Sequence, residues 1–127
     1  MLTTFMGLLL RGSLIAPLAL GACSTSSSTA ATAPTANGAR VDGARARHLV
    51  GSGAALLDVR TPEEFGAGHL DGAINISVDS LAGRLAELPH DREIVVYCRS
   101  GNRSARAASI LVGAGHQVHD LGPMSAW

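Results

Sequence analysis

Short apolar segments alternate with helical patterns along residues 40–127, and this alternation constrains the fold more than any other feature of the chain. A short strand is expected near Val41, and four further segments predict strands: Ala54–Asp58, Ala73–Ser77, Glu93–Tyr97 and Gln117–Leu121. Glu93–Tyr97 has apolar side chains on both faces, which is typical of a central strand. Because strands that alternate with helices form a parallel sheet with crossover connections, we predict a single α/β domain.

The helical patterns between these segments have definable ends. Thr61-Pro62-Glu63-Glu64 is a capping box with proline at the first helical position. Ser104–Val112 is rich in alanine and is closed by Gly113, and residues 41–50 predict a short strand and then a helix that ends near Gly51. Three leucines at helical spacing and a terminating proline predict one more helix: Leu81, Leu85, Leu88 and Pro89.

Residues 1–22 have the pattern of a secretory signal. Arg11 precedes the apolar run Gly12–Ala22, which is shorter than the roughly 20 residues that span a bilayer and ends in small residues. Leu20-Gly21-Ala22-Cys23 resembles the bacterial lipoprotein box, whose cysteine is lipidated and becomes the mature N-terminus. An ordinary cleaved signal followed by a chance cysteine is the alternative, and Met6 is a second candidate start.

The chain is therefore predicted to have three parts: a lipoprotein-type signal peptide at 1–22, a flexible tether at 23–39 and a folded domain at 40–127. The tether is rich in Ser, Thr and Ala and has too few apolar side chains to offset the entropy lost on ordering. Lipid chains on Cys23 would anchor the protein to a membrane on its extracytoplasmic side, in the periplasm or at the cell surface.

Composition excludes several classes of protein. Ten basic residues balance ten acidic ones, so the chain lacks the basic excess of a nucleic-acid-binding protein. Hydrophobic residues make up 46% of the chain, too many for an intrinsically disordered protein. His116 and His119 have no further ligands at metal-binding spacing, so we predict no metal site. We also expect no cofactor and a monomeric protein.

The most informative stretch is Cys98-Arg99-Ser100-Gly101-Asn102-Arg103-Ser104, between the predicted central strand and the alanine-rich helix. Ligands of open parallel sheets bind beyond the carboxyl ends of the strands, where Cys98 is expected. The residues after it suit a loop that wraps an anion with backbone N–H groups at a helix N-terminus. We predict that Cys98 is catalytic and that six residues bind an anionic substrate: Arg99, Ser100, Gly101, Asn102, Arg103 and Ser104. A cysteine that only fills the core is the alternative.

The charge pattern around this loop predicts a reactive thiol. Arg99, Arg103 and Arg106 lie within Ile94–His119, a window without Asp or Glu. Three positive charges and the N-terminus of a helix would stabilise the thiolate of Cys98.

Five stretches in order together resemble the rhodanese domain: Asp58-Val59-Arg60, Glu64-Phe65, Gly68–Ile76, Tyr97–Ser104 and Leu121–Trp127. The resemblance implies an α/β domain with a five-stranded parallel sheet, helices on both faces and a persulfide carried on Cys98. Asp58 and Arg60 end a strand beside the site, where we expect a supporting ion pair or hydrogen bonds. The sequence departs from the family pattern at Asp71 and Pro123, and a final helical segment usual in the family does not follow Trp127.

The resemblance implies a thiosulfate sulfurtransferase that passes sulfur from a small anionic donor to cyanide or a thiol. Two alternatives remain open, because a fold does not fix a function. One is a membrane-tethered persulfide carrier or partner-binding module with little turnover. The other is a phosphatase or arsenate reductase, in which the loop between the cysteine and the arginine is one residue longer than the four residues between Cys98 and Arg103 here.

Overall fold

The structure, a computed structural model, describes residues 36–127. The predicted signal peptide, Cys23 and the tether as far as residue 35 lie outside the described residues. The described elements follow in this order: α1 (Gly43–Gly51), β1 (Ala55–Asp58), α2 (Pro62–Ala67), β2 (Ile74–Asn75), α3 (Val78–Leu81), the 3-10 turn η1 (Leu85–Glu87), β3 (Ile94–Cys98), α4 (Asn102–Gly113), β4 (Val118–Pro123) and the 3-10 turn η2 (Met124–Ala126).

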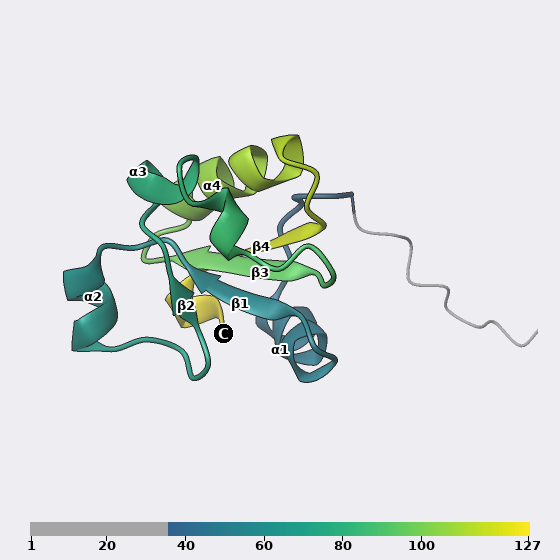
Figure 1. The fold of residues 1–127 in the computed structure, drawn as a ribbon. Coiled ribbons are helices and arrows are strands. Elements are labelled where there is room, and N and C mark those ends of the chain that lie inside the picture. Colours follow the sequence, from purple (N-terminus) through teal and green to yellow (C-terminus); the bar gives the residue numbers. More distant parts are fainter. Residues whose placement is uncertain (1–35) are drawn as a thin grey trace, which may run out of the picture. The chain divides into compact units, whose positions relative to one another are not determined.

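Four parallel strands form the sheet in the order β2-β1-β3-β4 (Figure 1). The prediction of a central strand at Glu93–Tyr97 is confirmed, because β3 pairs with β1 on one side and β4 on the other. The predicted fifth strand near Val41 is reduced to a single bridge between Arg40 and Asp120. It ends there because Asp42 already caps α1 by accepting a hydrogen bond from the N–H of Arg45.

Helices cover both faces of the sheet, as predicted. Figure 1 shows α3 and α4 on one face and α1 with η2 on the other. Side chains alternate along the strands, so each face has its own apolar cluster. Leu57, Val96 and Leu111 lie in the cluster beneath α4, whereas Val95, Tyr97 and Leu49 lie in the cluster beneath α1. The buried strand β3 therefore contributes to both cores.

The leucines at helical spacing do not form the predicted single helix. The chain forms the short helix α3, then a turn, then η1. Gly83 interrupts the pattern, and glycine is unfavourable inside a helix because its backbone loses the most freedom. Leu81 and Leu88 are nevertheless buried, so the spacing identified the face that packs on the core but not its secondary structure.

Contacts with the sheet begin at Asn37, within the segment predicted as tether. The Asn37 side chain donates to the carbonyl of His116 at 2.9 Å and accepts from the N–H of Val118 at 2.7 Å. The N–H of Gly38 donates to the carbonyl of Val118 at 2.8 Å. These bonds lead the chain along β4 to the Arg40 bridge.

Candidate functional site

Cys98 is the last residue of β3, and its side chain is fully buried. The chain then turns sharply at Gly101, the residue that precedes α4, whose φ of 99° lies in the left-handed region. Residues with a Cβ rarely adopt this conformation, so the turn favours glycine. The turn directs backbone N–H groups back toward the cysteine sulfur.

Hydrogen bonds from this loop surround the sulfur. The N–H of Gly101 donates to Cys98 Sγ at 2.9 Å. Burial of the thiol raises its pKa, but hydrogen bonds from the N–H and hydroxyl of Ser104 and from the N–H groups of Gly101 and Ser100 together lower it below its ordinary value. The loop therefore favours the thiolate, which is the nucleophilic form of cysteine.

An irregularity in the sheet shapes the wall beside Cys98. Val96 pairs with Asp120, but Tyr97 pairs with Gly122, so Leu121 is an extra residue on β4. A bulge of this kind re-aims the strand beyond it. As a result, Pro123 lies opposite Cys98 in the register of the two strands.

The supporting residues predicted from sequence form a buried ion pair. Arg60 Nη2 lies 2.6 Å from Asp58 Oδ2, and the two residues are 5% and 0% exposed. The hydrogen bond to Asp58 raises the pKa of Arg60 further above its ordinary value, so the guanidinium stays charged. Arg60 also donates to the carbonyl of Gly68 at 2.7 Å, and its guanidinium lies 5.7 Å from the centre of the Tyr97 ring. The pair ties the segment after α2 to the carboxyl edge of the sheet.

Two of the three predicted positive charges are paired with acids from elsewhere in the chain. Arg103 donates to both carboxylate oxygens of Glu64 on α2, at 2.6 and 2.9 Å. Arg106 lies 3.2 Å from Asp79 on α3. The window Ile94–His119 lacks acids in sequence but not in space, so the expected excess of three positive charges is wrong. The pKa of Cys98 is lowered by hydrogen bonds from Ser104, Gly101 and Ser100.

The structure brings together only part of the predicted substrate-binding set. Gly101 and Ser104 are buried with Cys98, whereas the side chains of Arg99, Ser100 and Asn102 are exposed. Of these exposed residues, Ser100 contacts the sulfur through its backbone N–H and not through its side chain.

Three residues that contact this site were not assigned to it from sequence. Arg40 donates to the carbonyl of Gly101, Glu64 binds Arg103, and the Tyr97 ring lies beside the guanidinium of Arg60. Burial raises the pKa of Tyr97 to about 12, so the hydroxyl stays protonated. Glu64 could have been assigned to the site because it lies in one of the stretches that resemble the rhodanese domain. No sequence pattern pointed to Arg40.

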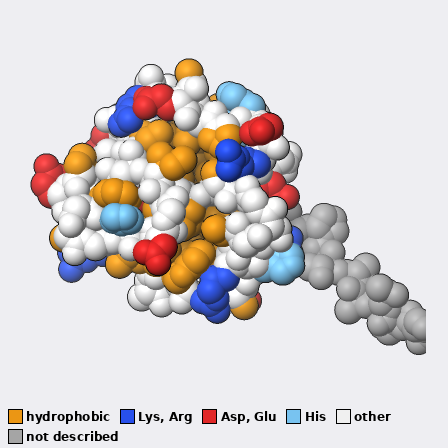
Figure 2. Space-filling view, turned by 60° about the horizontal axis from the view of Figure 1, so that its bottom comes forward, with side chains coloured by type: hydrophobic (Ala, Val, Ile, Leu, Met, Phe, Trp, Pro, Cys, Tyr) orange, Lys and Arg blue, Asp and Glu red, His pale blue; other side chains and the backbone are white. Residues whose placement is uncertain are grey.

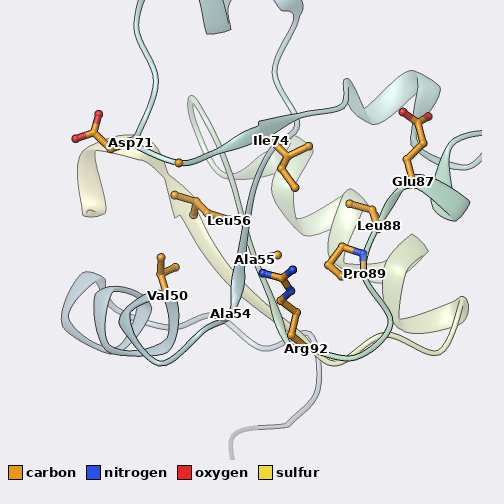
Figure 3. A pocket seen from close by; sticks show the side chains of 11 residues that line it. Val50, Ala54, Ala55, Leu56, Asp71, Ile74, Glu87, Leu88, Pro89 and Arg92 are labelled. Atoms are coloured by element: carbon orange, nitrogen blue, oxygen red, sulfur yellow. The ribbon is translucent and has the colours of Figure 1, made fainter.

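A separate cleft of about 440 Å³ lies along the first half of β1. Because β2 pairs with β1 only at Leu57 and Asp58, the edge of β1 before them is left uncovered. Figure 3 shows Val50, Leu56, Ile74 and Leu88 around this cleft, with Arg92 below them. On the face that Figure 2 brings forward, hydrophobic side chains gather in a hollow bordered by charged ones. None of the residues that line this cleft belongs to the Cys98 loop, so the cleft is separate from the candidate site.

Among residues 36–127, no cluster of three or more His, Cys, Asp or Glu side chains is arranged to hold a metal ion. Within the same part of the chain, no helix is long and apolar enough to cross a membrane.

Comparisons with known proteins agree with this geometry. The Rhodanese-like domain family matches residues 43–127. A "Thiosulfate sulfurtransferase GlpE" of Ectopseudomonas mendocina is 32% identical over 90 residues, which cover 69% of this chain and 83% of that protein. The structure of the "Human Single Domain Sulfurtransferase TSTD1" superposes with a TM-score of 0.59 at 27% identity and covers 69% of this chain and 90% of that one.

The same kind of domain also occurs within a larger protein. The "HTH-type transcriptional regulator Rv0324" of Mycobacterium tuberculosis is 50% identical over 68 residues, which cover 52% of this chain but only 30% of the regulator. The parallel α/β fold, the cysteine loop at the end of β3 and the family match over residues 43–127 lead to one conclusion. The chain belongs to the rhodanese-like domain family, whose relatives include sulfurtransferases.

Proposed function

We propose that the protein is a sulfurtransferase that moves sulfane sulfur from thiosulfate, or a similar small anion, to cyanide or a thiol through a persulfide on Cys98. The observation that carries this proposal is the hydrogen-bonded sulfur: Gly101 N–H lies 2.9 Å from Cys98 Sγ, and the pKa of the thiol is lowered. The sulfurtransferase names of relatives support the same reaction class.

The reaction is a double displacement. The Cys98 thiolate attacks the outer sulfur of thiosulfate, a new S–S bond forms, and the old S–S bond breaks with its electron pair leaving on sulfite. The acceptor, cyanide or a thiolate, then attacks the outer sulfur of the persulfide and regenerates the Cys98 thiolate. The N–H groups of the loop suit an anionic sulfur in both half-reactions. This sequence predicts ping-pong kinetics.

Cys98 is fully buried, so we infer that a donor reaches its sulfur only after the exposed side chains of the loop move aside. These side chains belong to Arg99, Ser100 and Asn102. Gly101 can keep its hydrogen bond to the sulfur during this movement.

The two cysteines of the chain allow a matched test. Cys23→Ser should keep sulfur transfer, and after incubation with thiosulfate its intact mass should rise by one sulfur atom while sulfite appears in solution. Cys98→Ser should form no such adduct and should lose thiosulfate:cyanide activity while it keeps its circular dichroism spectrum. A folded Cys98→Ser protein that still transfers sulfur would disprove the mechanism.

The same experiment separates the alternatives. A persulfide carrier would give the mass adduct and one equivalent of sulfite but no sustained turnover with cyanide. A phosphatase would hydrolyse aryl phosphates and give no adduct. The short loop between Cys98 and Arg103 disfavours the phosphatase, because a tetrahedral phosphate needs a wider cradle.

We also propose that Cys23 is lipidated and holds the domain outside the cytoplasm on the surface of a membrane, as its lipoprotein-like sequence indicates. Wild-type protein should then partition into the membrane fraction, and Cys23→Ser should be released from it. A wild-type protein recovered only in the aqueous fraction would contradict the anchor without affecting the sulfurtransferase proposal.

A further inference from the structure

Arg40 reaches the cysteine loop from the far side of β4. Its Nε donates to Asp120 Oδ2 at 3.1 Å, and its Nη2 donates to the carbonyl of Gly101 at 3.3 Å. Asp120 is buried, whereas the Arg40 side chain is 51% exposed. One guanidinium thus joins the segment before α1 to both β4 and the loop that follows Cys98.

The guanidinium fits because two glycines leave room for it. A Cβ added to Gly122 would lie 1.9 Å from Arg40 Nη1, and one added to Gly101 would lie 3.0 Å from the same atom. Both glycines also have positive φ values, 81° and 99°, a conformation that residues with a Cβ rarely adopt. Arg40 consequently lies directly against the loop backbone and is more than a surface ion pair with Asp120.

Arg40 and the sulfur bind opposite ends of the same residue. The carbonyl of Gly101 accepts from Arg40 Nη2, and the N–H of Gly101 donates to Cys98 Sγ. Asp120 completes the arrangement, because its Oδ1 accepts from the N–H of Gly122 at 2.8 Å while its Oδ2 holds Arg40. The Gly101 carbonyl also accepts from the Ser104 hydroxyl at 3.0 Å and from the N–H of Ala105 at 3.2 Å. Arg40 thus adds a contact from outside the loop to those that α4 makes with Gly101.

We propose that Arg40 is a positioning residue of the Cys98 site, which holds Gly101 so that its N–H stays directed at the sulfur. This inference rests on the function proposed above, since it assigns Arg40 to the loop that would bind the persulfide. Arg40 does not touch the reacting atoms and acts through Gly101. Arg40 is the arginine that lies against Gly101 and Gly122, so the proposal does not extend to exposed arginines elsewhere in the domain.

The test measures the pH dependence of Cys98 alkylation by iodoacetamide in the full chain, with Cys23→Ser present throughout. Arg40→Ala should shift the alkylation profile to higher pH and slow the reaction at neutral pH by about threefold, because a less fixed Gly101 N–H stabilises the thiolate less. Arg40→Lys should restore part of this loss, because an ammonium keeps the charge but not the two-sided fork. Arg47→Ala, which removes an exposed arginine of α1, is the matched control and should change nothing.

Asp120→Asn tests the hold on Arg40. Asparagine has one acceptor oxygen, so it can accept from the N–H of Gly122 or from Arg40 but not from both, and its side-chain N–H groups then face the other donor. Alkylation in Asp120→Asn should therefore slow, by no more than in Arg40→Ala. The proposal is overturned if Arg40→Ala leaves the alkylation profile unchanged, or if Arg40→Ala and Arg47→Ala shift it equally. Thiosulfate:cyanide activity is measured in parallel: its absence from the parent protein would reject the sulfurtransferase proposal, while the alkylation profiles would still decide the role of Arg40.

Discussion

At Cys98, burial and hydrogen bonding act on the thiol in opposite directions. Burial raises its pKa, and donors from Ser104, Gly101 and Ser100 lower it by a larger total amount. The Ser104 hydroxyl has a single proton and donates to the carbonyl of Gly101 at 3.0 Å, with Cys98 also within its reach. When Cys98 ionises, the same proton can turn to the sulfur, so Ser104 stabilises the loop in one state and the thiolate in the other.

Ser104→Ala is therefore expected to raise the pKa of Cys98. A hydrogen bond to a charged group contributes about 1.5–3 kcal/mol, so alkylation at neutral pH should slow by roughly ten- to a hundredfold. The pH profile of iodoacetamide alkylation measures the change. Ser109→Ala is the control, because Ser109 lies on the same helix but is exposed and donates to the carbonyl of Ala105. Equal profiles for the two variants would show that the Ser104 hydroxyl does not act on the sulfur.

At the scale of elements, α2 has no buried residue, so few apolar contacts hold it to the domain. Its own capping box, in which the Thr61 side chain accepts from Glu64 N–H and Glu64 accepts from Thr61 N–H, is as predicted. Glu64 Oε2 also binds Arg103, and that ion pair joins α2 to the first turn of α4. Loss of the ion pair should free α2 without unfolding the sheet.

Glu64→Gln tests this attachment, because glutamine keeps the capping box but not the charge. Amide exchange in α2 should speed up several-fold, while the melting temperature should change little, since partly exposed ion pairs contribute about 0–1 kcal/mol. Glu63→Gln is the control: it removes the same charge from an exposed neighbouring residue and should leave amide exchange in α2 unchanged.

The hydrogen bond from Arg103 lowers the pKa of Glu64 from 4.5 to about 2. Because the pKa of Glu64 is lower in the folded protein than in the unfolded chain, the ion pair contributes its full stabilisation above pH 4.5. This contribution is lost as the pH falls from 4.5 toward about 2. The protection of α2 amides, taken relative to their intrinsic exchange rate at each pH, should fall in the wild type as the pH drops through that interval, whereas Glu64→Gln should show no such fall. Wild-type protection that stays constant there would contradict the role of the pair.

The first turn of α1 is packed against the C-terminal turn η2. A Cβ at Gly43 would lie 2.0 Å from the carbonyl oxygen of Ala126, which leaves no space for any side chain. Gly43→Ala should therefore destabilise the domain by about 1–3 kcal/mol, as overpacked sites do. Gly51→Ala, at the other end of the same helix with nothing within 4 Å, should be neutral or stabilising by up to about 1 kcal/mol. Urea unfolding of both variants measures the difference, and a stable Gly43→Ala protein would show that η2 does not pack there.

For the molecule as a whole, histidine burial links stability to pH near neutrality. His116 is 3% exposed, stacks on His90 with ring centres 4.3 Å apart, and has an Nε2 atom that lacks a partner among the described residues. Burial, with the charge of His90, lowers the pKa of His116 below 6.5. As the pH falls below 6.5, His116 becomes protonated in the unfolded chain before it does in the folded domain. The free energy of unfolding therefore decreases as the pH falls below 6.5.

Wild-type protein should therefore melt at a lower temperature at about pH 5.5 than at about pH 7.5. His116→Gln should reduce this pH dependence, because the buried titratable group is gone. His48→Gln, which changes an exposed histidine of α1, should preserve it. A pH dependence that is equal in all three proteins would assign the effect to other groups.

Much of the fold followed from local pattern. The capping box at Thr61, the central strand before Cys98 and the helix after Ser104 each depend on neighbouring residues, and the described elements confirm them with shifts of one or two positions at their ends. The single helix through Leu81, Leu85 and Leu88 failed because periodicity reports which face is buried, while Gly83 decides whether the backbone stays helical. The fifth strand failed because the capping preference of Asp42 ended it after one bridge.

The sequence by itself determined an α/β domain with a cysteine loop at the end of its central strand, because strand pattern, turn glycine and helix start are contiguous in the chain. Only the tertiary structure decided the charges around that loop. Arg103 meets Glu64 across 39 positions and Arg40 meets Gly101 across 61, and no local pattern records which side chains the folded sheet brings together. Hydrogen bonds from the loop stabilise the thiolate of Cys98, whereas two of the three arginines near it in sequence, Arg103 and Arg106, are bound to distant acids.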